Sequence, residues 1–182
     1  NGDIIDVAAL SSYDKNKHKD YDCTLEEEYD MANVILDMFD ALIPGAEKVY
    51  LWGNHEGRYH KWHADVNNRK YGDMMHPTKA MKLKERGYKV YEDCHNDYHT
   101  IGSLQIMHGE YYNIHCAKKH LDVFRRNILF NHTHRIQTYR EGDFCGYNAG
   151  FLGDIKSPAF NYAPMGTKSA WANGFAVVYL DS

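Results

Sequence analysis

The sequence Val49-Tyr50-Leu51-Trp52-Gly53-Asn54-His55-Glu56 decides the fold that we expect for this chain. Its first four residues are apolar or aromatic, which is typical of a short buried β-strand. Gly53 ends this run, and a carboxamide and an imidazole follow directly. Open α/β folds place their sites at the carboxyl ends of their strands, so Asn54 and His55 are candidate site residues. The alternative is a plain turn that leads into a helix.

Three further fragments combine an apolar run with carboxylates or imidazoles: Gly2-Asp3-Ile4-Ile5-Asp6, Met107-His108-Gly109-Glu110 and Asn131-His132-Thr133-His134. Together with Gly53-Asn54-His55-Glu56, and in their order along the chain, these fragments resemble the motifs of the calcineurin-like metallophosphoesterase superfamily. Those motifs read Asp-x-His, Gly-Asp-x-x-Asp, Gly-Asn-His-Glu, a lone His and Gly-His-x-His. The resemblance extends from Gly2 to about Arg135. Asn131 stands where the family has Gly, and asparagine tolerates the left-handed backbone conformation of such a turn.

The resemblance implies an α/β fold in which two packed mixed β-sheets are flanked by helices, an αββα sandwich. We expect residues 1–182 to form one such domain, since the sequence contains no repeat and no low-complexity linker. The Asp-x-His motif is not found ahead of Asp3, and no strand precedes Asn1 to deliver that loop. We therefore expect further sequence upstream, and an N-terminally truncated domain here.

The resemblance also implies a centre with two divalent metal ions. One ion would be held by Asp3, Asn54, His108 and His132, and the other by Asp3, His134 and the missing motif. Carboxylate, carboxamide and imidazole ligands without thiolates suit Mn, Fe or Zn. Two such ions would provide a bridging hydroxide and would bind the phosphate oxygens. Without the missing motif, we expect the first site to fill more readily and the chain to hydrolyse phosphoesters poorly.

Three residues near the proposed ligands have other expected roles. His55 would act as the general acid beside the leaving oxygen, because its ordinary pKa is close to neutral pH. Arg58, one helical turn further on, is a candidate for binding the substrate phosphate through its planar guanidinium. Asp6 is expected to support the site or its turn.

An Asp-x-His sequence does occur later, as Asp97-Tyr98-His99. It follows the polar run at residues 92–96 instead of a buried strand. We therefore expect His99 to belong to the arm of a β-hairpin and not to a metal site.

Composition limits the class of protein. The chain has 182 residues, 43% of them hydrophobic, which is enough for a substantial core. No apolar run is long enough to cross a bilayer, so we expect no membrane partner. The formal net charge of −4 argues against a whole-surface affinity for nucleic acid, although a local basic patch stays possible. The four cysteines are scattered, which favours a reduced cytoplasmic setting.

Periodicity and turn residues predict the remaining elements. Thr24 and Glu27 form a capping box ahead of a helix at residues 25–43, which Pro44-Gly45 ends. The apolar residues of this helix are expected on one stripe: Leu25, Tyr29, Ala32, Ile35, Leu36, Phe39, Leu42 and Ile43. Short helices are expected at residues 59–66, where Tyr59, Trp62 and Val66 are spaced for packing on one face, and at residues 77–84 and 115–124. Strands are expected at residues 88–91, 98–101, 103–107, 128–130, 136–140, 144–148 and 175–180, with a hairpin turn at Gly142.

The leading hypothesis is a metal-dependent phosphoester hydrolase, either a phosphatase, a phosphodiesterase or a nuclease. The alternative is a catalytically inactive scaffold of the same fold that binds a protein partner, and a third possibility is a structural domain with a single metal ion. The substrate stays open, including nucleotides and nucleic acid, because specificity would lie in loops such as residues 15–21, 58–78 and 151–171. The oligomeric state also stays open.

Overall fold

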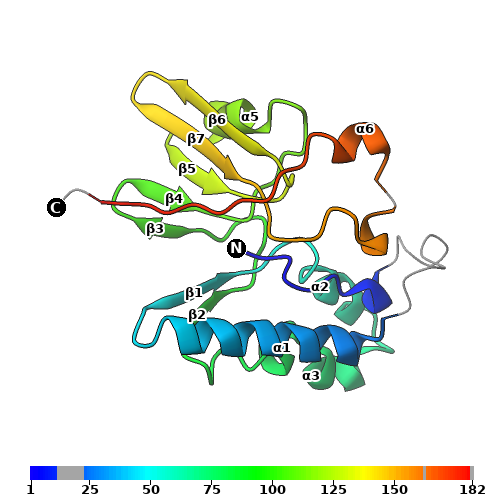
Figure 1. Ribbon diagram of the computed structural model, residues 1–182. Helices are drawn as coiled ribbons and strands as arrows, with labels where there is room; N and C mark the ends of the chain where they lie inside the picture. Colours follow the sequence, from blue (N-terminus) through cyan, green and yellow to red (C-terminus); the bar gives the residue numbers. More distant parts are fainter. Residues whose placement is uncertain (12–22, 162, 181–182) are drawn as a thin grey trace. The chain divides into compact units, whose positions relative to one another are not determined.

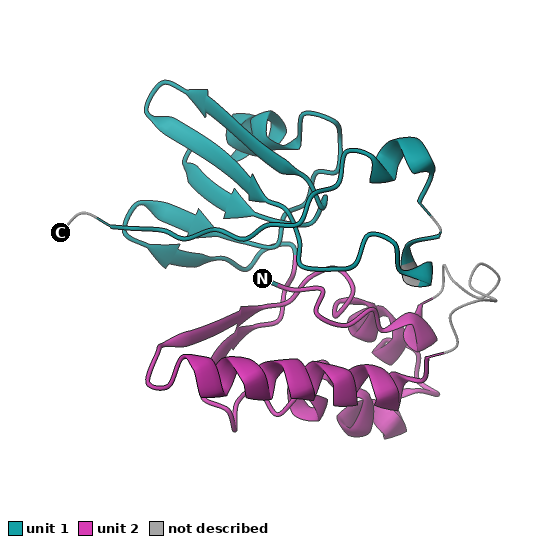
Figure 2. Cartoon of the chain, in the orientation of Figure 1, with its two compact units in different colours: residues 1, 95–182 teal, residues 2–94 magenta. Residues whose placement is uncertain are grey.

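The computed structural model describes residues 1–11, 23–161 and 163–180. The chain divides into two compact units, which Figure 2 shows in different colours. Unit 1 contains Asn1 and residues 95–182, and unit 2 contains residues 2–94. The sequence also predicts a polar surface loop at residues 11–20. Residues 12–20 of this loop, with His18, and the expected specificity loop at residues 15–21 lie outside the described residues.

Unit 2 is built around two parallel strands. β1 (Lys48–Leu51) and β2 (Tyr88–Tyr91), both predicted as strands, pair in parallel, with Lys48 opposite Tyr88 and Leu51 opposite Tyr91. Helix α1 (Leu25–Leu42) precedes β1 and runs along this pair (Figure 1). The other elements of unit 2 are η1 (Ala8–Leu10), α2 (Arg58–His63), η2 (Arg69–Tyr71), α3 (Gly72–Met75) and α4 (Pro77–Ala80). The helix expected at residues 77–84 is therefore shorter than predicted.

The capping box at the start of α1 is confirmed. The Thr24 side chain accepts a hydrogen bond from the Glu27 backbone N–H (3.2 Å), and the Glu27 carboxylate accepts one from the Thr24 N–H (2.8 Å). These two contacts satisfy backbone donors that a helix start otherwise leaves unpaired. At the other end, the helix stops at Leu42, just before Pro44-Gly45, also as predicted.

The apolar stripe predicted for α1 is only partly buried. Tyr29, Ala32 and Leu36 are buried and belong to the core of unit 2. Ile35 and Leu42, in contrast, are 37% and 73% exposed. The physical reason is that one residue turns a helix by about 100°, so Ile35 and Leu42 lie on the neighbouring face. The two-stranded sheet covers only the face that carries Tyr29, Ala32 and Leu36.

Other apolar residues of unit 2 complete its core. Trp52, which follows β1, is 1% exposed, and Tyr59 on α2 packs edge-on against it at 6.3 Å between ring centroids. The packing role predicted for Tyr59 and Trp62 is therefore confirmed. The same prediction is wrong for Val66, which is 71% exposed because α2 ends at His63 and does not carry this residue to the core.

Unit 1 contains a mixed five-stranded sheet in the order β3-β4-β5-β7-β6. Its three central strands run parallel, and the two edge strands are antiparallel to their neighbours. The hairpin predicted around Gly142 is the β6–β7 connection. The strands are β3 (His99–Ile101), β4 (Leu104–Ile106), β5 (Asn127–Phe130), β6 (Ile136–Glu141) and β7 (Phe144–Ala149).

Helix α5 (Cys116–Phe124), predicted at this position, packs against the side of the sheet formed by β5, β6 and β7 (Figure 1). Between them lies the core of unit 1, with Met107, Cys116, Ala117, Ile128 and Phe130. Two short elements follow the sheet, η3 (Pro158–Phe160) and α6 (Met165–Lys168).

The closing strand predicted at residues 175–180 is wrong. The run has no strand assignment, and Tyr179 is 89% exposed. A single bridge between Phe151 and Asn173 holds the chain just ahead of it. The run lies over one face of the sheet, where residues 175–179, Leu129 and Tyr147 line a cavity of about 500 Å³. An apolar run of this length forms a strand only where a partner strand accepts its backbone hydrogen bonds.

The fold class is thus confirmed at the level of a mixed α/β protein with a five-stranded mixed sheet and a two-stranded parallel sheet. The αββα sandwich and the single domain stay predictions. Among the helices of the described part of the chain, none has the length and apolar character needed to cross a membrane.

Candidate functional site

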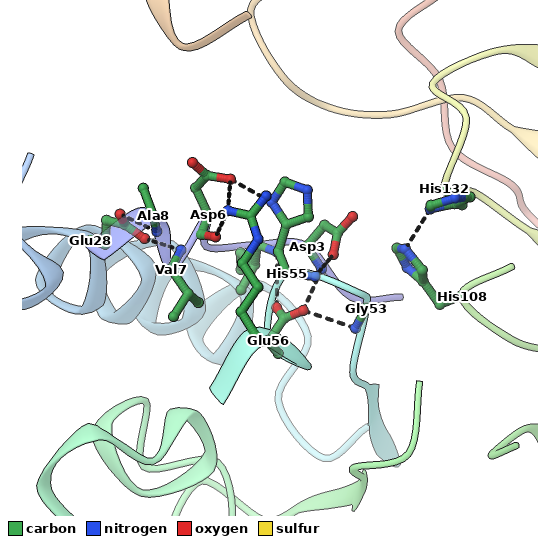
Figure 3. A network of polar contacts seen from close by, with 12 residues as sticks. Asp3, Asp6, Val7, Ala8, Glu28, Gly53, His55, Glu56, His108 and His132 are labelled. Atoms are coloured by element: carbon green, nitrogen blue, oxygen red, sulfur yellow. Dashed lines mark hydrogen bonds and ion pairs between the residues drawn. The ribbon is translucent and has the colours of Figure 1, made fainter. Parts of the chain in front are cut away.

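The turn that follows β1 is held by a buried carboxylate. The side chain of Glu56 is fully buried and accepts four hydrogen bonds within unit 2 (Figure 3). Oε2 accepts from the backbone N–H groups of Gly53 (2.8 Å) and Asp3 (2.9 Å). Oε1 accepts from the Tyr50 hydroxyl (2.6 Å) and the Ile4 N–H (3.2 Å). Glu56 therefore joins the loop that bears Asp3 to the loop that bears His55.

Asp3 and His55 are in direct contact as a result. The Asp3 carboxylate accepts a hydrogen bond from the backbone N–H of His55 at 3.0 Å. The backbone of Asp3 has a φ of +55°, which is uncommon outside glycine and is found often at functional sites. Asn54 lies next to His55 in the same turn. Asp3, Asn54 and His55, which the sequence predicted for the site, are thus close together in unit 2.

The imidazole of His55 is paired with Asp6. Its Nδ1 lies 2.6 Å from the Asp6 carboxylate, and Nη1 of Arg58 lies 3.0 Å from the same oxygen. Nη1 of Arg58 also donates to the Asp6 carbonyl at 2.7 Å. The supporting role predicted for Asp6 is confirmed. Arg58 was predicted to bind a phosphate, and the contacts seen here give its guanidinium a role in orienting Asp6.

Both partners of this pair have shifted pKa values. Burial alone would lower the pKa of His55, but the negative charge of Asp3 and the hydrogen bond to Asp6 outweigh it and raise this pKa above its ordinary value. Burial alone would raise the pKa of Asp6, but the hydrogen bond and charge of His55, together with Arg58, hold it low. These shifts favour an imidazolium next to a carboxylate, and an imidazolium can donate a proton.

In unit 1, two predicted ligands meet because their strands are parallel neighbours. His108 follows β4, His132 follows β5, and Leu129 lies opposite Ile106 in the register. The carboxyl ends of parallel strands lie at the same edge of a sheet. Nε2 of His108 accordingly lies 3.1 Å from Nδ1 of His132, with the rings at 66° to one another (Figure 3).

This pair of imidazoles has the geometry of two ligands on one metal ion. Nitrogen ligands bind zinc at about 2.0 to 2.1 Å, so two of them lie about 3.0 to 3.4 Å apart, depending on the angle at the metal. Nδ1 of His108 lies 3.1 Å from the backbone carbonyl of Asn1, which can only accept a hydrogen bond. His108 therefore carries its proton on Nδ1 and directs the Nε2 lone pair toward His132, as metal-bound histidines do.

His134, the third predicted imidazole ligand, packs among aromatic rings. Its ring stacks on Phe151 at a centroid distance of 4.4 Å and meets Trp171 edge-on at 4.5 Å. Phe160 lies 5.8 Å away. His132 and His134 have backbone φ values of +36° and +59°, so both ends of this short loop adopt left-handed conformations. The role of His134 as a ligand stays a prediction.

Sequence reasoning missed the anchoring role of Glu56 and the packing partners of His134. For Glu56 the signal was available, since an acidic residue three positions after a strand-ending glycine can bind that glycine's N–H. The alternative Asp97-Tyr98-His99 sequence lies where it was expected, because His99 begins strand β3 and pairs with Ile106.

A scan against protein-family models, a search of curated proteins and a search of solved structures each found no match to this chain. The resemblance to the calcineurin-like metallophosphoesterases therefore rests on the motifs themselves.

Proposed function

We propose that this chain is a metal-dependent phosphoester hydrolase of the calcineurin-like metallophosphoesterase type. The observation that carries the proposal is the pair of facing nitrogen atoms of His108 and His132, 3.1 Å apart at the carboxyl edge of a parallel strand pair. Two imidazoles in this arrangement suit a divalent transition metal. The hydrogen bond between His108 and the Asn1 carbonyl supports the same tautomer that metal binding requires.

The wider ligand set is part of the proposal and rests on the motif resemblance. It comprises two divalent ions, Mn, Fe or Zn, with ligands among Asp3, Asn54, His108, His132 and His134. Bound divalent ions of this kind supply an activated water at neutral pH and neutralise phosphate charge. The substrate class is a phosphoester, with a nucleotide or nucleic acid included among the candidates.

The protein's own residues would then handle the proton. His55, held by Asp6, donates a proton to the leaving oxygen of the substrate, and its contact with the Asp6 carboxylate favours the protonated ring. Arg58 holds Asp6 in place and is the proposed contact for a substrate phosphate. The alternative, an inactive scaffold, requires no such proton donor. The His55–Asp6 pair therefore favours the hydrolase.

The test measures metal binding first and turnover second. Bound metal per chain is determined by elemental analysis and by titration with Mn²⁺ and Zn²⁺. Turnover of a chromogenic phosphodiester and a chromogenic phosphomonoester is then followed with Mn²⁺. We expect His108→Ala to lose metal and activity, and His55→Ala to keep metal and lose about a hundredfold or more in rate. His99→Ala, in the unused Asp-x-His sequence, is the matched control and should change neither.

The possible outcomes separate the hypotheses. Because this chain is expected to hydrolyse phosphoesters poorly, its rates are judged against those of His55→Ala, and metal-dependent rates no higher than in His55→Ala would favour the scaffold. Loss of the folded state on metal removal, again without turnover, would favour a structural metal domain. Equal metal binding by the parent protein and His108→Ala would refute the proposed site.

A further inference from the structure

Helix α5 reaches both loops that carry the histidine pair of unit 1. Its residues Cys116 and His120 are four positions apart, so they lie on the same face of the helix. Both side chains are fully buried, with 0% exposure. His120 contacts the loop that follows His108, and Cys116 contacts the loop that contains His132. Neither side chain belongs to the motifs discussed above.

The contacts of His120 fix its tautomer. Nδ1 lies 2.8 Å from the backbone carbonyl of Cys116, and a carbonyl can only accept, so Nδ1 carries the proton. The Nε2 lone pair then accepts from the backbone N–H groups of Glu110 (3.0 Å) and Tyr111 (3.4 Å). Burial lowers the pKa of His120 to about 4, which keeps the ring neutral and this acceptor intact. The ring stacks on Phe130 at a centroid distance of 3.8 Å.

The contacts of Cys116 with the loop that contains His132 belong to a buried polar cluster. The Cys116 thiol donates to Oε1 of Gln137 (3.0 Å) and lies 3.4 Å from the hydroxyl of Thr133. Nδ2 of Asn148 donates to that same hydroxyl at 2.5 Å. Thr133 is the residue between His132 and His134. The cluster therefore holds the middle residue of the loop His132–His134 through its hydroxyl group.

The loop requires such support because of its backbone. Both residues that flank Thr133 have positive φ values, and residues other than glycine keep that conformation only where their surroundings impose it. A pair of ring nitrogens at 3.1 Å is equally demanding, since a displacement of about 1 Å removes the geometry of a metal site. The loop after His108 contacts the buried side chain of His120, and the loop with His132 contacts the buried side chain of Cys116.

We propose that α5 is the positioning element of the histidine pair. His120 sets the place of His108 by binding the two N–H groups that follow Gly109, and Cys116 with Asn148 sets the place of His132 by binding Thr133. This inference rests on the proposed function, because it assigns the support of the same site. His120 and Thr133 are positioning residues, since they act on the ligands and not on a substrate.

The first test uses two substitutions of His120. His120→Phe keeps a ring that can stack on Phe130 but removes the acceptor, and His120→Gln keeps an acceptor near the position of Nε2. Long-range ¹H–¹⁵N spectra of the metal-free protein report the tautomers of His108 and His132 and their mutual hydrogen bond. We expect this signature to be lost in His120→Phe and restored in His120→Gln. Val123→Ala, on the exposed side of the same helix, should leave it unchanged.

The affinity for Zn²⁺ gives the second readout. Residues that support metal ligands typically change metal affinity about ten- to a hundredfold, and we expect a loss of this size in His120→Phe but not in His120→Gln. A parallel pair tests the other arm, with Thr133→Val losing the hydroxyl and Thr133→Ser keeping it. This pair also covers the case in which His120→Phe does not fold.

The results distinguish this inference from the proposed function. If His108→Ala loses Zn²⁺ while His120→Phe and Thr133→Val bind it like the parent protein, the positioning role is wrong and the metal site stands. If the parent protein binds neither Zn²⁺ nor Mn²⁺, the proposed function fails. The imidazole spectra of the two pairs of variants then still decide whether α5 positions the histidines.

Discussion

Replacing Glu56 by glutamine changes one oxygen of a buried carboxylate into an NH₂ group. The four donors that now face this carboxylate are the N–H groups of Asp3, Ile4 and Gly53 and the hydroxyl of Tyr50. They fall into two pairs, one on each oxygen. A glutamine side chain can accept from only one pair, so its oxygen would take the N–H groups of Gly53 and Asp3. Its NH₂ group would then face the Tyr50 hydroxyl, which can turn to accept, and the Ile4 N–H, which cannot.

The loss can be estimated from these contacts. A hydrogen bond to a charged group contributes about 1.5 to 3 kcal/mol, and the one from the Ile4 N–H is removed, so the free energy of unfolding should fall by about 1.5 to 3 kcal/mol. Domains of this size have a total stability of about 5 to 15 kcal/mol. The substitution is therefore expected to remove a measurable part of the stability of unit 2. It should also loosen the contact between Asp3 and His55.

The assay is urea denaturation followed by far-UV circular dichroism and by tryptophan fluorescence, which reports Trp52 in the core of unit 2. Glu85→Gln is the control, because Glu85 is exposed and a surface substitution of this kind changes stability by less than about 0.5 kcal/mol. A loss below about 1 kcal/mol in Glu56→Gln, or one equal to the control, would show that the four contacts do not carry the stability assigned to them.

Three further predictions concern stability. Thr24→Ala removes the capping box of α1 and should cost about 1 kcal/mol, measured by urea denaturation against the parent protein. Gly87→Ala places alanine at a φ of +81° in open space and should lower the free energy of unfolding by about 1 to 2 kcal/mol. Gly150→Ala, at a φ of +80°, also brings Cβ within 2.5 Å of the Ala172 carbonyl oxygen and should lower the melting temperature further than Gly87→Ala does. Equal losses in the two variants would refute the clash. His120 has a folded pKa of about 4, below its unfolded value of about 6.5, so the unfolded chain binds its proton first as the pH falls. The contribution of neutral His120 to the free energy of unfolding is therefore complete above pH 6.5 and falls by about 3 kcal/mol by pH 4. This part of the pH dependence of stability should be absent in His120→Gln.

The order of elements could be predicted well from the sequence where local chemistry decides. The strands at residues 49–52 and 88–91, the capping box of α1 and the hairpin at Gly142 all depend on residues close together in the chain. The meeting of His108 and His132 could also be anticipated, since both follow apolar strands and such strands pair in parallel in α/β folds.

The failures have a common cause. The run at residues 175–180 has the composition of a strand, and Val66 has the spacing of a packed helix residue. Whether either is buried depends on which element lies opposite, and periodicity carries no information on that. The same holds for Ile35 and Leu42 on α1, which have the right spacing but lie beyond the face that the strand pair covers.

The sequence by itself determined the strands that precede His55, His108 and His132 and the residues of the proposed metal site, because turns, caps and apolar runs act over a few residues. Only the tertiary structure decided how those residues are held. The contacts of Glu56 with Asp3 and Ile4, the pairing of His55 with Asp6, and the contacts of α5 with the histidine loops join segments from ten to more than fifty residues apart. Buried polar groups must find partners wherever the fold provides them, and that requirement cannot be read from neighbouring positions in the chain.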